Sequence, residues 1–168
     1  MVNDYSRTAL KELLTWGIQS ISEFTNIREH VGNATIELQL FSDNMLYTML
    51  HFMNEKKTFA DESEARHEII NNFINDYRAH HRIRRKEDFY PEEYDSRPDI
   101  QFLFWCVWII PNILVNPVSN TYHEEHANKF ITKIPYLLSI YDEHFANEPQ
   151  ENVFKILTQA MSFCLIFP

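Results

Sequence analysis

One long apolar stretch, residues 99–117, constrains the fold of this chain more than any other feature. It reads DIQFLFWCVWIIPNILVNP, and every residue from 102 to 110 is apolar. A helix that spans a membrane needs about 18 or more apolar residues in a row, so this stretch is too short to cross a bilayer. It therefore predicts a central helix that is apolar all round because other helices cover it.

Glycine is scarce, and this bears directly on the fold class. Only Gly17 and Gly32 occur among 168 residues. A β-sandwich or a Rossmann-like fold needs many tight turns, so the scarcity favours long helices. The apolar fraction of 45% allows a full core, and a chain of this length forms one domain. Residues 1–168 are therefore expected to form a single all-α domain of six to eight helices packed around the central apolar helix.

Amphipathic spacing predicts three helices before the central stretch. The first is expected from a cap at Asp4 to about residue 28, and the second over about 33–54. The third begins with the acidic turn 61–64 and ends in the basic run 78–86. The longest loop of the chain is expected after that run.

Prolines mark the expected helix boundaries in the second half of the chain. Pro98 suits the first turn of the central helix, and Pro111 is expected to kink or divide that helix. Ser119 or Asn120 should cap the next helix, which ends near residue 134. Pro135 should begin another, and residues 147–149 should open the last.

The two cysteines indicate the compartment. Cys106 and Cys164 both lie among large apolar residues, where a thiol is usually buried and inert. The N-terminal residues do not show the basic and apolar pattern of a signal peptide. We therefore expect a reduced, cytoplasmic protein that neither spans nor binds a membrane.

Motifs for catalysis are absent from the sequence. It contains no glycine-rich phosphate loop, no Walker lysine and no Gly-x-Ser-x-Gly elbow. No arginine has a histidine at the offset that small helical ribonucleases use. We therefore expect that the protein is not an enzyme and needs neither a cofactor nor a metal ion.

Histidine and glutamate spacing keeps one alternative open. His123 and His126 lie three residues apart, and Glu64 and His67 repeat the Glu-x-x-His spacing of di-iron helix bundles. A metal-dependent helical enzyme would need these pairs to meet across the bundle. A further ligand, such as His51 or His144, would have to join them. A solvated helix face is the simpler interpretation of the two histidines.

The basic run 78–86 supports a second alternative, a regulator associated with nucleic acid. Its cations could contact phosphates, or they could complement a helix C-terminus and pair with the acids that follow. The net charge of −9 would repel nucleic acid over long distances, which favours the structural interpretation. The five cations are Arg78, Arg82, Arg84, Arg85 and Lys86.

The acidic and aromatic segment after this run is the best candidate for a binding surface. Tyrosines supply large, rigid contact area at low entropic cost, and carboxylates complement a basic partner. The predicted partner-binding residues are Glu87, Asp88, Tyr90, Glu92, Glu93, Tyr94 and Asp95.

A resemblance follows from the segment EDFYPEEYD in a small, acidic, cysteine-poor helical chain. Such a chain resembles bacterial immunity proteins, which neutralise toxins in contact-dependent growth inhibition and related secretion systems. The resemblance implies a one-to-one complex with a basic protein toxin, typically a nuclease, whose active site is occluded. It implies no direct contact with nucleic acid. In that complex the carboxylates would engage the toxin, and Tyr90 and Tyr94 would anchor the contact.

Overall fold

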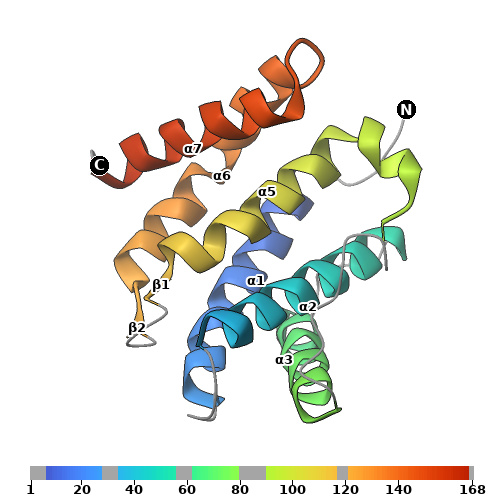
Figure 1. Cartoon of the computed structure of the whole chain (residues 1–168), viewed down its shortest axis with the longest axis vertical. Coiled ribbons are helices and arrows are strands. Elements are labelled where there is room, and N and C mark those ends of the chain that lie inside the picture. Colours follow the sequence, from blue (N-terminus) through green and yellow to red (C-terminus); the bar gives the residue numbers. More distant parts are fainter. Residues whose placement is uncertain (1–6, 28–33, 56–61, 80–89, 117–120, 167–168) are drawn as a thin grey trace.

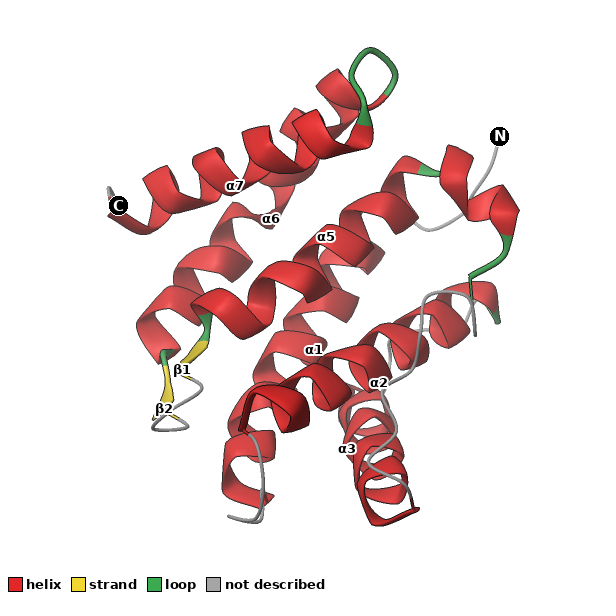
Figure 2. Ribbon diagram, in the orientation of Figure 1, coloured by secondary structure: helices red, strands yellow, loops and turns green. Residues whose placement is uncertain are grey.

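Six α-helices make up most of the residues that the computed structural model describes, which are 7–27, 34–55, 62–79, 90–116 and 121–166 (Figures 1 and 2). A 3-10 helix, η1 (Glu92–Ser96), and two short strands, β1 (Val115–Asn116) and β2 (Thr121–Tyr122), complete the described elements. The predicted all-α fold with six to eight helices is confirmed. The α-helices are α1 (Arg7–Ile27), α2 (Ala34–Asn54), α3 (Glu62–Ala79), α5 (Pro98–Ile113), α6 (Glu124–Phe145) and α7 (Gln150–Ile166).

The apolar helix α5 lies at the centre, as the sequence predicts. It packs against α1, α2 and α6, and the side chains of Phe102, Trp105 and Ile110 are fully buried. The indole ring of Trp105 stacks on Phe130 of α6, with 6.4 Å between the ring centroids. Within the described ranges, no helix combines the length and the apolar character needed to cross a bilayer.

Helices α1, α2 and α3 form the N-terminal part of the core. Gly17 of α1 faces α2, where a Cβ atom would lie 2.9 Å from the sulfur of Met45. The absence of a side chain therefore lets the two helices approach closely. The rings of Phe24, Phe41 and Phe73, one from each helix, pack with centroids 4.8 to 5.5 Å apart.

Helices α6 and α7 form an antiparallel pair that lies beside α5 (Figure 1). Hydrogen bonds tie both ends of the pair. Tyr141 Oη donates to Gln150 Oε1 at 3.0 Å near the connecting turn, and Lys129 Nζ donates to the carbonyl of Leu165 at 3.2 Å near the other end. Helix α7 also meets α5 through Trp105 Nε1, which donates to Thr158 Oγ1 at 3.4 Å.

The structure contradicts the expectation for Pro135 and one of the two outcomes expected for Pro111. Pro135 lies inside α6 and does not begin a new helix, because the apolar stripe continues on one face before and after it, through Phe130, Ile134, Leu138 and Tyr141. Burial of that stripe outweighs the single backbone hydrogen bond that proline removes. Pro111 does not divide α5 either, since it lies in the last turn and the helix ends two residues later.

The connection from α5 to α6 also differs from the prediction. Val115 pairs with Tyr122 in a short antiparallel ribbon, and the backbone N–H of His123 donates to the carbonyl of Leu114 at 2.8 Å. His123, without a side-chain capping hydrogen bond, occupies the N-cap position of α6. The expectation that Ser119 or Asn120 caps this helix is therefore wrong. The expected cap at Asp4 lies outside the described residues.

Candidate functional site

Part of the acidic segment, Glu92–Ser96, forms the 3-10 helix η1 where a loop was expected. Glu92, Glu93 and Asp95 are exposed there. Within the part of the chain that the structure describes, no lysine or arginine forms an ion pair with these three residues. Glu87 and Asp88, also predicted to bind a partner, lie outside the described residues.

Tyr94 is not on the surface, which corrects the expectation that it is an exposed anchor. Its side chain is only 4% exposed and belongs to the hydrophobic core. Its ring packs edge-on against Tyr90, and the guanidinium of Arg97 lies 5.8 Å from its centroid. A 3-10 helix turns once in three residues, so one residue of η1 faces the body while its neighbours face solvent.

Tyr90 is half-buried and links η1 to α5. Its hydroxyl donates to Asp95 Oδ1 at 2.9 Å and accepts a hydrogen bond from Gln101 Nε2. Its ring packs edge-on against Phe104, with 4.7 Å between centroids. Burial, followed by the bond to Asp95, raises the pKa of Tyr90, so the phenol stays protonated and remains a donor. Tyr90 therefore connects η1 to α5, and its ring packs against the rings of Tyr94 and Phe104.

These and further contacts hold η1 against the start of α5. Gln101 Nε2 also donates to the carbonyl of Tyr94 at 3.1 Å, and the N–H of Arg97 donates to the same carbonyl at 3.0 Å. Arg97 itself is paired with Asp99 at 2.9 Å. The backbone of η1 is thus anchored to the start of α5, and the side chains of Glu92, Glu93 and Asp95 extend from it at exposed positions. Little backbone entropy would be lost when this segment binds a partner.

Trp108 is a surface feature that the sequence analysis missed. It lies on α5 within the run expected to be covered on all sides, yet 59% of its side chain is exposed. It borders a groove of about 480 Å³ between α5 and α7, whose walls include Phe154 and Thr158. The coverage of α5 is therefore incomplete along one stripe. A run of nine apolar residues carries no periodic signal that could have located this stripe.

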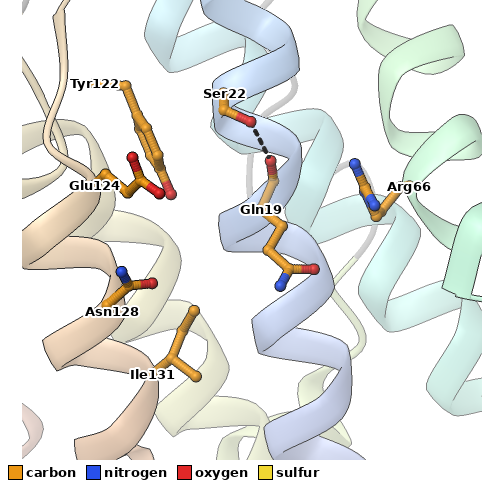
Figure 3. A pocket seen from close by; sticks show the side chains of 7 residues that line it. All are labelled: Gln19, Ser22, Arg66, Tyr122, Glu124, Asn128 and Ile131. Carbon is orange, nitrogen blue, oxygen red and sulfur yellow. Dashed lines mark hydrogen bonds between the residues drawn. The ribbon is translucent and has the colours of Figure 1, made fainter.

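A second concavity, of about 520 Å³, lies where α1 meets α3 on one side and α6 with β2 on the other (Figure 3). Some of its polar side chains bond within the protein, whereas the buried Gln19 Oε1 has no hydrogen-bond partner among the described residues. Arg66 pairs with Glu23, and Ser22 Oγ donates to the carbonyl of Gln19 at 2.9 Å. Among the lining residues, no serine or cysteine is paired with a general base.

Tyr122 also lines this pocket. Its hydroxyl donates to the carbonyl of Ile18 at 3.4 Å, and burial, followed by the charge of Glu124, raises its pKa to about 12. A phenol with that pKa is fully protonated near neutrality, so it is poorly suited to act as a base. The pocket is therefore a polar gap between packed elements, and its lining residues do not form a recognisable catalytic arrangement.

The histidines of the metal hypothesis do not converge. His123 and His126 are neighbours, with ring centroids 5.3 Å apart, while Glu64 and His67 are exposed on α3. In the described ranges, no three histidine, cysteine, aspartate or glutamate side chains come together in a way that could hold a metal ion. The metal-dependent alternative requires the two pairs to meet across the bundle, and the described residues do not show such a meeting.

Both cysteines are buried and free of disulfides. Burial raises the pKa of the Cys106 thiol well above its ordinary value, so the reactive thiolate is disfavoured. Of the basic run, only Arg78 is described, exposed near the end of α3. Arg82, Arg84, Arg85 and Lys86 lie outside the described residues, so the nucleic-acid alternative stays a prediction.

The candidate site is thus the face formed by η1 and the exposed stripe of α5. It combines exposed carboxylates with an exposed indole, which are features of a surface that binds protein. Comparison of the chain with protein-family models, with curated proteins and with solved structures gives no match.

Proposed function

We propose that this protein is an immunity protein, which binds a basic toxin one-to-one and occludes its active site. A bacterial nuclease is the toxin class that fits best, because an active site built to attract phosphate is itself basic. The complex would form in the cytoplasm, where the two buried thiols stay reduced.

The observation that carries the proposal is a group of exposed acidic residues on η1, whose backbone is anchored to α5. Tyr94 is buried, and the backbone around it is held by hydrogen bonds, so Glu92, Glu93 and Asp95 project from a fixed base. Fixed charges of one sign speed the encounter with a partner of the opposite sign and select its orientation. The net charge of −9 acts in the same direction over a longer range.

Co-expression with the product of the gene immediately upstream tests this proposal. That protein should inhibit growth when it is expressed alone. Cells that also carry the present protein should grow, and the two proteins should elute together as a one-to-one complex. Normal growth in the absence of the present protein, or no complex, would contradict the proposal.

A charge reversal locates the contact. The double variant Glu92→Lys with Glu93→Lys should slow association by about 10-fold or more at low salt, because it replaces attraction with repulsion. The matched control is Glu124→Lys with Glu125→Lys, which changes two exposed carboxylates on α6 by the same total charge. An equal loss in both variants would mean that net charge alone matters and that η1 is not the contact.

A further inference from the structure

The groove beside Trp108 has the chemistry of an anchor pocket. Trp108 forms one wall from α5, and Phe154 and Thr158 of α7 contribute to the other. An indole that is 59% exposed in the most apolar helix of the chain leaves a large apolar surface in contact with water. Large exposed aromatics beside a groove are typical of positions that receive an apolar side chain from a partner.

This groove and the acidic segment lie along one face of α5. Gln101, Phe104 and Trp108 follow one another at spacings of three and four residues, which places them on one helix face. Tyr90 joins the N-terminal end of this face to η1, through its hydrogen bonds to Gln101 and Asp95. With a rise of 1.5 Å per residue, Trp108 lies about 15 Å along the helix from the start of α5.

The charges around this face select the occupant. Glu92, Glu93 and Asp95 lie at one end, and Glu151 is on the rim of the groove. Against these four carboxylates, Lys155 is the cation among the residues that line the groove. A second copy of the chain would bring the same acidic face and meet repulsion. A basic protein would meet attraction at the η1 end, while Glu151 and Lys155 balance each other at the groove.

We infer that Trp108 is the anchor of the partner interface and that its groove receives an apolar side chain from a basic protein partner. The acids of η1 steer this partner, and the groove holds it. This inference rests on the proposed function and deepens it, because it moves the expected anchor from Tyr94, which is buried, to Trp108. The other end of the contact stays on η1.

Site-specific photo-crosslinking tests the inference in the cells that make the protein. One variant carries Trp108→benzoylphenylalanine, and the matched control carries Tyr136→benzoylphenylalanine. Tyr136 is 54% exposed on α6, and its neighbour Pro135 is also exposed. Melting temperatures of both variants establish that each is folded. A protein trapped at either position is then identified by mass spectrometry and purified, and its affinity for the unmodified chain is measured.

The expected result is a basic protein trapped at position 108 and not at position 136. Its affinity should fall about 30-fold or more with Trp108→Ala, and by less than about threefold with Tyr136→Ala. If the basic protein is trapped at position 136 and Trp108→Ala binds like the original chain, the inference fails while the proposed function stands. A second copy trapped at position 108 makes the groove a self-association site and also overturns the inference. If no basic protein is trapped at position 108, the inference fails, and the proposed function is then judged by the co-expression experiment alone.

Discussion

Two tryptophans of α5 lie in different environments. Trp105 and Trp108 are three residues apart and so only about 60° apart around the helix axis, yet Trp105 is 0% exposed and Trp108 is 59% exposed. The ring of Trp105 packs against Phe102 and Phe130, and its Nε1–H donates to Thr158. Trp108 borders a groove that other helices do not fill.

The difference shows how one apolar helix can serve both folding and binding. Burial of the covered side chains contributes stability, because apolar area is removed from water. The apolar area of Trp108 stays in contact with water in the free protein and is available for burial by a partner. Truncation of a covered and of an exposed side chain should therefore change different measurements, and the predictions below test this, from the largest expected effect to the smallest.

Truncation of Trp105 should reduce the stability of the protein more than any other substitution considered below. Trp105→Ala should lower the free energy of unfolding by about 3–5 kcal/mol, because it leaves a cavity in the core. Trp108→Ala should lower it by less than about 1 kcal/mol, since little of that indole is buried. Urea denaturation of both variants measures the contrast. A similar loss in the two variants would show that Trp108 is a core residue.

The same contrast should extend to η1, where Tyr94 faces inward and Glu93 outward. Tyr94→Ala should cost about 3 kcal/mol of stability, because its ring is buried against Tyr90 and the core. Glu93→Ala should stay within about 0.5 kcal/mol. Thermal denaturation of each variant provides the measurement. A Tyr94→Ala variant as stable as the original chain would contradict the conclusion that Tyr94 anchors η1 to the core.

Tyr90 offers a smaller effect with a defined pH dependence. Tyr90→Phe should cost about 1 kcal/mol near neutral pH, because the hydroxyl's bonds with Asp95 and Gln101 are lost. The pKa of Tyr90 is raised above its ordinary value of 10, so above pH 10 the unfolded chain loses this proton while the folded chain keeps it. The stability of the original protein should therefore fall as the pH rises above 10.

In Tyr90→Phe that fall should be shallower, because one of the phenols that resist ionisation is gone. Tyr122, with a pKa raised to about 12, remains in the variant and accounts for part of the residual slope. Chemical denaturation across this alkaline range makes the comparison. Identical slopes would mean that the pKa of Tyr90 is the same in the folded protein and in the unfolded chain.

Much of the fold could be predicted from sequence, because helix formation here follows local signals. The periodic apolar stripes of α1, α2, α3 and α7 indicate their positions closely. Pro135 shows where local signals fail. The rule that proline begins a helix is correct for an isolated segment, but burial of Ile134 and Leu138 against the core keeps α6 continuous. The β1–β2 ribbon was missed because two-residue strands have no periodicity.

The candidate site was only partly predictable. Carboxylates are rarely buried without a partner, so the exposure of Glu92, Glu93 and Asp95 follows from residue type alone. The inward position of Tyr94 depends on the 3-10 turn, which the acidic composition of the segment does not encode. The exposure of Trp108 depends on where α7 lies relative to α5. That is a long-range arrangement, and an uninterrupted apolar run gives no hint of it.

Fluorine NMR of protein labelled with fluorotryptophan tests most directly the claim that α5 buries Trp105 in the core and exposes Trp108 to a partner. The chain has three tryptophans, Trp16, Trp105 and Trp108, and Trp108→Phe assigns the exposed one by loss of a resonance. In the free protein, the Trp108 signal should show the largest shift between H2O and D2O, because the other two indoles are buried. When the unlabelled basic partner binds, that signal should move and lose its solvent dependence, while the Trp105 signal stays in place. A complex that forms with the Trp108 signal unchanged would contradict the account.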